Sequence, residues 1–237
     1  PKTIDNDIVG VETTFGFSTA VTESRTAIIG AHEEAKGAWN GVGLVKLMGR
    51  DSGFIAASAT LANSDVNFCF IPESPLTLDG ENGFLKQLEK RLDTKRHAVI
   101  VVAEGLQLSD MDEKDCKRDA SGNIILEDVG IALKEKIKDY FKKIGKPMSL
   151  KYIDPSYIIR SVPANAQDSI LCLAYGQYAV HAGMAGKTNM VIGYWNQHFT
   201  HIPITLATLK RKKVDPHGYL WQTVLSTTGQ EGDPTLR

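Results

Sequence analysis

The sequence predicts an α/β fold with a mostly parallel sheet, and two observations support this prediction. Short apolar runs alternate along the chain with longer segments in which apolar residues recur at helical spacing. The composition, with 42% hydrophobic and 23% charged residues over 237 positions, is that of a globular protein that can bury a substantial core. Strands that alternate with helices favour parallel strands covered by helices on both faces.

The first half of the chain predicts three helices and three strands. Helices are expected at 14–36, at 54–62 and from Phe84 onward, where apolar residues line one side of each segment. Strands are expected at 42–47, 66–71 and 97–102, each an apolar run bounded by turn residues.

The second half continues the same alternation. Residues 109–123 are rich in charge and turn residues, which predicts an exposed excursion. A helix is expected from Val129 to about 145, a strand at 150–154, a long helix at 164–185, and strands at 190–194 and 199–204. No repeat or linker is visible, so composition alone gives no domain boundary.

Charge and cysteine content exclude several classes of protein. The formal net charge is -1, and the one basic run, 210–213, is short enough to be a solvated surface, so no nucleic-acid partner is expected. Three widely separated cysteines indicate neither a disulfide framework nor a zinc site. No apolar run is long enough to span a membrane, and a cytoplasmic location is expected.

Four polar segments lie where the carboxyl ends of strands are expected, and together they predict a ligand site. They are residues 3–7, 48–53, 103–105 and 154–160. In open α/β sheets, ligands bind at the carboxyl ends of the strands, where loops and helix N-termini converge. Together these segments offer carboxylates, guanidinium groups and glycines, a mixture that suits a phosphorylated polyol.

Each of these polar residues also has an ordinary structural interpretation. Asp5 and Asp7 could cap turns, Ser52 could be a helix N-cap, and Arg50 could form a surface ion pair. In the same way, Glu104 could be an exposed loop acid, Arg160 a structural residue and Tyr157 a core residue. The shared position at the ends of successive elements favours the ligand site.

The four segments, taken in order, resemble the phosphofructokinase family. The motifs are PKTIDND (1–7), MGRDSGFIA (48–56), VAEG (102–105) and YIDPSYIIR (152–160), and FGFSTAV (15–21), IPESP (71–75) and AVHAGMAGKT (179–188) extend the resemblance over nearly the whole chain. The sequences of two segments, LVKLMGRDSGFIA (44–56) and KYIDPSYIIR (151–160), are most similar to the trypanosomatid, plant and related bacterial branch of the family.

The resemblance implies roles for the first motif. Asp5 would take the proton from the 1-hydroxyl of fructose 6-phosphate, so that the oxygen can attack a phosphoryl group. Thr3 would line the transferred phosphoryl group, Lys2 would help to stabilise it, and Asp7 would bind Mg²⁺.

The other motifs would bind the sugar phosphate. Arg50 would offset the charge on the transferred phosphoryl group, while Met48 and Gly49 would shape the sugar pocket. Glu104 would accept hydrogen bonds from sugar hydroxyls. A further set would hold the 6-phosphate: Tyr157, Arg160 and Lys151, the last reaching across from a neighbouring subunit.

The implied function is that of a 6-phosphofructokinase in glycolysis, with ATP as the expected donor. A pyrophosphate-dependent enzyme is the main alternative, because Lys2 occurs in both types, and a non-catalytic sugar-phosphate-binding regulatory subunit is another. The sequence departs from the best-known bacterial enzymes at Tyr157, where they have His, and at Gly41, where they have a second cross-subunit Arg.

The family also implies an architecture of two similar three-layer α/β/α domains and a homotetramer. Residues 17–158 would form the fructose 6-phosphate-binding domain, 1–16 and 159–208 the remainder of the phosphoryl-donor-binding domain, and 209–237 a C-terminal tail. Family members carry a Gly-rich donor-binding loop before the PKTIDND segment. Its absence from these 237 residues leads to the expectation of a fragment with little or no kinase activity alone.

Overall fold

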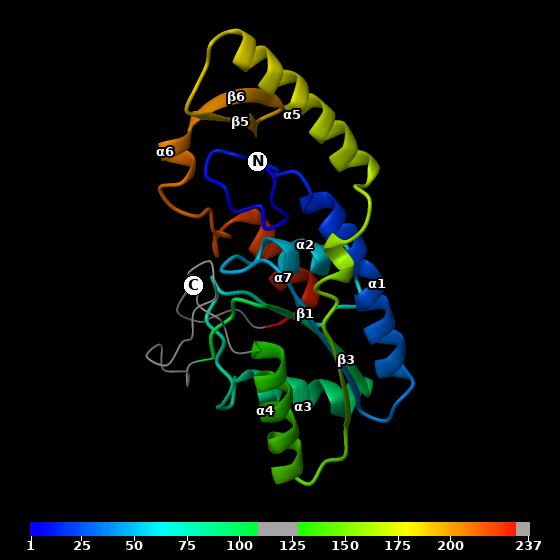
Figure 1. The fold of residues 1–237 in the computed structure, drawn as a ribbon. Coiled ribbons are helices and arrows are strands. Elements are labelled where there is room, and N and C mark those ends of the chain that lie inside the picture. The colour runs from blue at the N-terminus through cyan, green and yellow to red at the C-terminus, as the bar shows by residue number, and fades with distance from the viewer. Residues whose placement is uncertain (109–127, 231–237) are drawn as a thin grey trace.

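The computed structural model describes residues 1–108 and 128–230, so the expected excursion at 109–123 lies outside the described residues. Figure 1 shows two regions, a lower one built on a four-stranded sheet and an upper one that contains a long helix and a pair of strands. Residues 1–16 form a loop beside the upper pair of strands and lead into the helix that begins at Phe17.

The lower sheet is parallel throughout. Its strands are β1 (Gly41–Leu47), β2 (Phe68–Phe70), β3 (His97–Ala103) and β4 (Ser149–Ile153), in the order β2-β3-β1-β4. Leu47 pairs with Ala103 at the carboxyl ends of β1 and β3, which brings the loops after these two strands together. The prediction of a mostly parallel α/β sheet is therefore confirmed.

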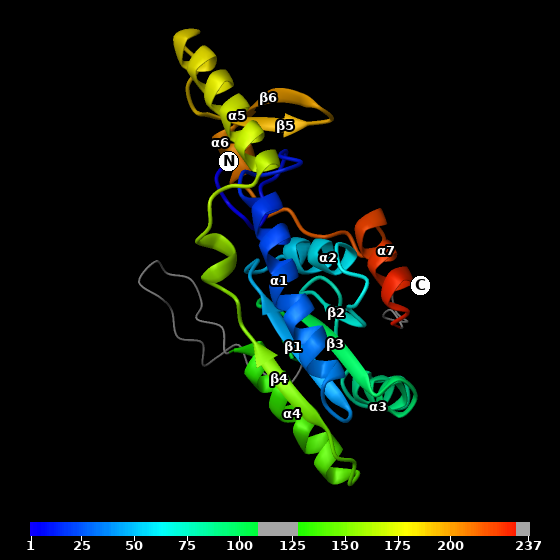
Figure 2. The same ribbon diagram turned by 90° about the vertical axis from the view of Figure 1, so that its right-hand side faces the viewer.

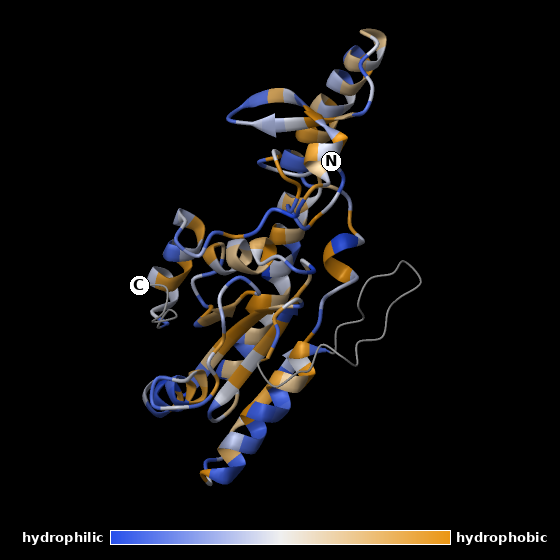
Figure 3. Cartoon of the chain, turned by 90° about the vertical axis from the view of Figure 1, so that its left-hand side faces the viewer, coloured by the Kyte–Doolittle hydropathy of each residue, from blue (hydrophilic) through white to orange (hydrophobic). Residues whose placement is uncertain are grey.

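Helices cover both faces of this sheet. The helices are α1 (Phe17–Lys36), α2 (Phe54–Leu61) and α7 (Tyr219–Thr228) on one face, and α3 (Phe84–Lys95) and α4 (Val129–Lys143) on the other. Val45 and Leu47 pack towards the first face and Val42 and Leu44 towards the second, because side chains alternate along a strand. Figure 3 shows that these strands are largely hydrophobic, as a doubly covered sheet requires.

Helix α7 lies where no helix was predicted. Trp221 and Val224 are buried in the same core cluster as α1 and α2, and Figure 2 shows α7 beside α2. The short helices at Ile204–Ala207 and Ile158–Arg160 were not predicted either. The predicted elements differ at their ends: for example, α1 begins at Phe17 rather than 14, and β2 is limited to Phe68–Phe70. Within the described residues, no helix is long and apolar enough to cross a membrane.

The upper region contains α5 (Ala166–Met184), β5 (Met190–Trp195), β6 (His198–Pro203) and the short helix α6 (Ile204–Ala207). The two strands pair antiparallel. Asn196 and Gln197 connect them with φ values of 46° and 65°, the left-handed conformation that a two-residue hairpin turn requires. Both strands were predicted, and the structure adds their pairing.

Asp168 of α5 caps the start of α1, so the N-termini of the two helices are joined. The carboxylate of Asp168, which is fully buried, accepts hydrogen bonds from Gly16 N (3.1 Å) and Thr19 N (2.7 Å) and from the Thr19 hydroxyl (2.6 Å). Asn165 caps α5 by accepting from Asp168 N at 2.9 Å. The FGFSTAV motif is thereby joined to the start of α5, and this contact connects the two regions.

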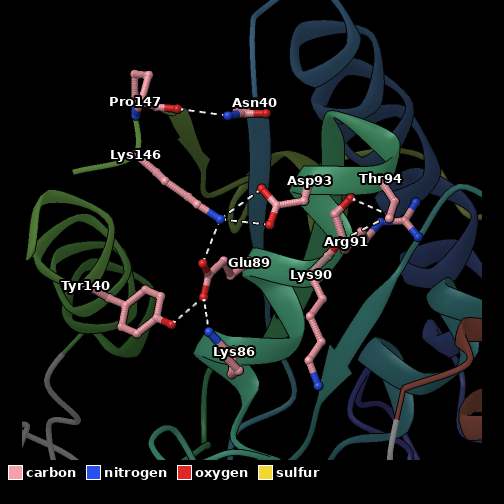
Figure 4. Close-up of polar contacts among 10 residues, drawn as sticks. All are labelled: Asn40, Lys86, Glu89, Lys90, Arg91, Asp93, Thr94, Tyr140, Lys146 and Pro147. Atoms are coloured by element: carbon pink, nitrogen blue, oxygen red, sulfur yellow. Dashed lines mark hydrogen bonds and ion pairs between the residues drawn. The ribbon is translucent and has the colours of Figure 1, made fainter. Parts of the chain in front are cut away.

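A polar network joins α3 to the end of α4 (Figure 4). Lys146 Nζ lies 2.6 Å from Glu89 Oε1 and 2.7 Å from Asp93 Oδ2, while Tyr140 and Lys86 each donate to Glu89 Oε2 at 2.8 Å. These hydrogen bonds, that of Lys146 first, lower the pKa of Glu89 to about 2.

Candidate active site

The loop that contains Asp5 is held by its own side chains. Thr3 Oγ1 accepts a hydrogen bond from Asp5 N at 3.2 Å, and Thr14 donates its hydroxyl to the Thr3 carbonyl at 2.7 Å. Asn6 takes a left-handed φ of 56°, and its Oδ1 accepts from Thr14 N at 3.0 Å. The buried asparagine therefore fixes the turn that separates Asp5 from Asp7.

The turn after β1 is fixed by the acid at the end of β3. Glu104 Oε1 accepts hydrogen bonds from Gly49 N (3.2 Å) and Arg50 N (2.7 Å). Arg50 has a left-handed φ of 49°, and a Cβ on Gly105 would lie only 1.9 Å from the Arg50 carbonyl oxygen. Gly105 is thus required for this close approach, and Glu104 stabilises a strained backbone through at least one of its oxygens.

Ser52 joins this turn to the Asp5 loop. Its buried hydroxyl lies 3.2 Å from the Asp5 carbonyl oxygen and 3.0 Å from that of Gly49. Helix α2 has Gly53 as its N-cap and no side-chain cap, so the interpretation of Ser52 as a helix cap is wrong. The residue instead brings two candidate site segments together.

Asp5 and Arg50 face each other in this group. Arg50 Nε lies 3.9 Å from Asp5 Oδ2, and the Asp5 side chain is only 13% exposed. Burial, and after it the charge of Asp7, raises the pKa of Asp5; Arg50 and the Thr3 hydroxyl act in the opposite direction. A carboxyl whose pKa is raised towards the working pH is suited to accept a proton.

Asp7 is paired with a residue from the far end of the chain. Arg211 Nη1 donates to Asp7 Oδ2 at 2.5 Å, and this bond is the main reason that the pKa of Arg211 is raised. Mg²⁺ is commonly held by one or two carboxylates and completed by phosphate oxygens, and Asp7 fits such a site. The described residues contain no cluster of three metal-ligating side chains that could hold an ion without a substrate.

The basic run at 210–213 is exposed at Lys210, Arg211 and Lys213, as a solvated surface would be, but it also contacts the loops of the candidate site. Besides the Arg211 pair with Asp7, Lys212 Nζ donates to the carbonyls of Val11 (2.7 Å) and Glu12 (3.2 Å). Burial lowers the pKa of Lys212 to about 8. Lys213 Nζ donates to the Asp51 carbonyl. Three of the four cations therefore contact loops of the candidate site.

Lys46 anchors the segment that carries Tyr157 and Arg160. Its Nζ lies 2.8 Å from both Asp128 Oδ2 and Asp154 Oδ2, and Asp154 in turn accepts from Ser156 N at 3.1 Å. Burial alone would lower the pKa of Lys46, but the hydrogen bonds to the two carboxylates outweigh it and raise that pKa. Lys46 thus connects β1 to the start of this segment.

Tyr157 and Arg160 project from that segment into solvent. Tyr157 is 72% exposed, which rules out the core interpretation, and the Arg160 guanidinium carbon lies 4.8 Å from the centre of its ring. Lys151 is exposed on the edge strand β4, and Lys2 is exposed beside Phe15. No hydrogen bond or ion pair joins these four described residues to the Asp5 group.

The structure therefore gathers part of the predicted site. The gathered residues are Thr3, Asp5, Asp7, Gly49, Arg50 and Glu104, with Met48 half-buried in the same turn. Residues that sequence reasoning missed are Lys46, Ser52 as a link, Arg211, Lys212 and Lys213. The run of four basic residues was the one available signal for the last three.

The chain is similar to known proteins over nearly its whole length. The family model for phosphofructokinase matches residues 1–183. The ATP-dependent 6-phosphofructokinase of Borreliella burgdorferi is 54% identical over 236 residues, covering 97% of this chain and 53% of that protein. ATP-dependent 6-phosphofructokinase 5, chloroplastic, of Arabidopsis thaliana is 49% identical over 230 residues, covering 97% and 43%. The Trypanosoma brucei brucei protein named ATP-dependent 6-phosphofructokinase is 45% identical, covering 96% and 47%.

A solved structure shares the fold. The pyrophosphate-dependent phosphofructokinase of Marinobacter aquaeolei superposes with a TM-score of 0.71 at 20% identity, covering 99% of this chain and 60% of that one. The chain spans about half the length of the curated relatives it matches. Relatives from a spirochaete, a plant and a trypanosome agree with the branch that the motifs resemble.

Proposed function

The chain belongs to the phosphofructokinase family, and from this premise we propose that it acts in the transfer of a phosphoryl group from ATP to the 1-hydroxyl of fructose 6-phosphate. The observation that carries the proposal is the position of the partly buried Asp5 carboxylate, 3.9 Å from Arg50 and close enough to Glu104 for the charge of Glu104 to raise the pKa of Asp5. ATP is the proposed donor because relatives at 45–54% identity bear that name.

Asp5 serves as the general base in this proposal. Its carboxylate accepts the proton of the 1-hydroxyl as the oxygen attacks the phosphoryl group, and its raised pKa makes proton acceptance more favourable. Arg50, fixed by the Glu104 hydrogen bond to its backbone, offsets the charge that spreads over the phosphoryl oxygens. Thr3 and Lys2 lie on the same loop and line the path of transfer.

Mg²⁺, when bound, would neutralise phosphate charge, and Asp7 is the residue proposed to hold it. The hydrogen bond from Arg211 to Asp7 Oδ2 orients the carboxylate, as a metal ligand needs to be.

Glu104, Met48 and Gly49 are proposed to contact the sugar. Since Glu104 Oε1 already accepts two backbone hydrogen bonds, its other oxygen is the one proposed to accept from a sugar hydroxyl. Arg160 and Tyr157 are proposed to bind the 6-phosphate, which suits their exposure and the cation of Arg160.

Lys151 is proposed to act in a neighbouring subunit of a homotetramer. It lies exposed on the edge strand of the sheet, where its side chain can reach a second copy of the chain. Light scattering coupled to size-exclusion chromatography would measure the oligomer, and a monomer at assay concentration would contradict this part of the proposal.

The function is tested by a coupled assay for fructose 1,6-bisphosphate, with MgATP or pyrophosphate as donor, and by calorimetry with fructose 6-phosphate. The expected result is binding that depends on Arg160 and, in a protein in which a Gly-rich donor-binding loop precedes residue 1, turnover with MgATP. All variants are compared kinetically in that protein, because residues 1–237 alone are expected to have little or no kinase activity. Turnover with pyrophosphate but not with MgATP would overturn the choice of donor. Absence of binding heat, with no difference between wild type and R160A, would overturn the sugar-phosphate site itself.

A further inference from the structure

A second set of contacts surrounds the Asp5 group and comes from residues 211–214, here called the basic strap. Arg211 donates to the Asp7 carboxylate, Lys212 Nζ donates to two carbonyls of residues 11 and 12, and Lys213 Nζ donates to the Asp51 carbonyl. One short segment thus holds both the loop that carries Asp5 and the turn that carries Arg50.

The main chain of the basic strap adds to these side-chain contacts. Lys212 N donates to the Asp7 carbonyl at 2.6 Å, and Ile8 forms an antiparallel bridge with Arg211. The strap therefore lies along the loop as an added strand would. Its Arg211 interacts electrostatically with a group of acids that includes Asp5, Asp7 and Asp51. This arrangement lowers the mutual repulsion of those acids.

The far end of the basic strap is anchored in the core. Val214 is 2% exposed, and its N–H donates to Glu73 Oε1 at 3.0 Å. The same carboxylate oxygen accepts from Gly53 N, at the start of α2, also at 3.0 Å. Beyond it, Trp221 of α7 is buried against the core. The strap is therefore held in place at this end by the core, so its contacts at the other end can fix the position of the Asp5 loop.

We propose that the basic strap is a positioning device that sets the Asp5 loop against the Arg50 turn, with Lys213 as the residue that ties the turn to it. This proposal rests on the proposed function, since its consequence is the geometry of phosphoryl transfer. In that function Asp5 acts on the 1-hydroxyl and Arg50 on the phosphoryl group that the hydroxyl attacks. The rate of such a step falls steeply when the reacting groups are misplaced by about 1 Å.

The strap acts through other residues rather than on the substrate. Arg211 Nη1 donates to Asp7. Lys212 Nζ donates to backbone carbonyls and lies 4.8 Å from the centre of the Phe54 ring. Loss of Lys213 is therefore expected to lower kcat and to leave the KM for fructose 6-phosphate unchanged. A residue that bound the sugar phosphate would instead change KM.

The chain offers a matched control within the same run. Lys210 is exposed, and no hydrogen bond or ion pair of its side chain occurs among the described residues. K210M and K213M each remove one charge from the run, but only K213M removes the contact to the Asp51 carbonyl. K213R keeps a donor at this position and is expected to restore most of the rate.

The experiment compares wild type, K210M, K213M and K213R by steady-state kinetics and by hydrogen exchange of the amides at 3–12 and 48–53. The expected result is a kcat about tenfold lower in K213M at unchanged KM, faster exchange of both loops, and wild-type behaviour in K210M. Equal exchange in K210M and K213M, or faster exchange with an unchanged kcat, would overturn the proposal. If the wild type transfers no phosphoryl group, the proposed function fails, and the exchange comparison alone decides whether the strap holds the loops.

Discussion

Asp5 and Arg160, proposed for the two ends of the sugar phosphate, lie in contrasting surroundings. The Asp5 side chain is 13% exposed and sits among hydrogen-bonded loops, whereas Arg160 is exposed and stacks on Tyr157, itself 72% exposed. The end proposed for phosphoryl transfer is held by hydrogen bonds, while the end proposed to bind the 6-phosphate is open to solvent. Substitutions at the two ends should therefore separate into effects on rate and effects on binding.

The largest expected effect is that of D5N. Loss of the general base should lower kcat by about 10²- to 10⁴-fold. Calorimetry should show that fructose 6-phosphate binding changes little, because the proton is transferred only during the reaction. D51N, which removes an exposed carboxylate from the neighbouring turn, is the control and should keep most of the activity. A near-normal kcat in D5N would contradict the prediction that the Asp5 end controls the rate and the Arg160 end controls binding.

R160A is expected to have the opposite signature. A hydrogen bond to a charged group contributes about 1.5–3 kcal/mol, so the Kd for fructose 6-phosphate should rise by about tenfold to a hundredfold. The melting temperature should stay the same, because the side chain is exposed. R160K should recover part of the affinity, since it keeps the charge without the planar fork. Unchanged affinity in R160A would place the phosphate elsewhere.

E104A tests whether the Asp5 end is held by the protein itself. The substitution removes the acceptor for Gly49 N and Arg50 N and should lower the free energy of unfolding by about 1–2 kcal/mol. Urea denaturation measures this loss, and E104Q, which keeps an acceptor oxygen, should lose less. If E104A is as stable as R160A, the two ends do not differ in preorganisation.

The smallest effect is expected far from both ends, at Glu89. Its pKa is about 2 in the folded chain against an ordinary value of 4.5, so its stabilising contribution is complete above about pH 4.5 and is lost as the pH falls towards 2. Urea denaturation between pH 5 and 2 should therefore show a shallower decline in E89Q than in wild type. At neutral pH, E89Q should leave kcat and Kd unchanged, which makes it a reference for the other variants. An identical acid decline in both proteins would contradict the low pKa.

Periodicity and motif order predicted most of the sheet, its covering helices and the gathering of Asp5, Arg50 and Glu104. These features depend on local patterns, such as the apolar runs of β1 and β3 and the glycines that follow them. Their loops meet because parallel strands end at one edge, which follows from the fold class alone.

The missed features depend on partners that are distant in sequence. Arg211 and Asp7 are separated by 204 positions, and a run of lysines and arginine has the same composition whether it faces water or a carboxylate. Helix α7 was missed although Trp221 and Val224 show the spacing of one helical face, because the segment was interpreted as a tail. Lys46 lies within β1, and its partners Asp128 and Asp154 come from segments that are distant in the sequence.

The distance between Asp7 and Arg211 along the chain has a consequence for synthesis. A ribosome that adds about 5–20 residues per second makes the Asp5 loop about 10–40 s before the basic strap exists. Throughout that interval Asp7 lacks its partner Arg211, and the buried carboxylate of Asp168, which joins Gly16 and Thr19, is made only in the later part of it. The four-stranded sheet can form first, and the contacts between residues 211–214 and the Asp5 loop form only after that segment leaves the exit tunnel.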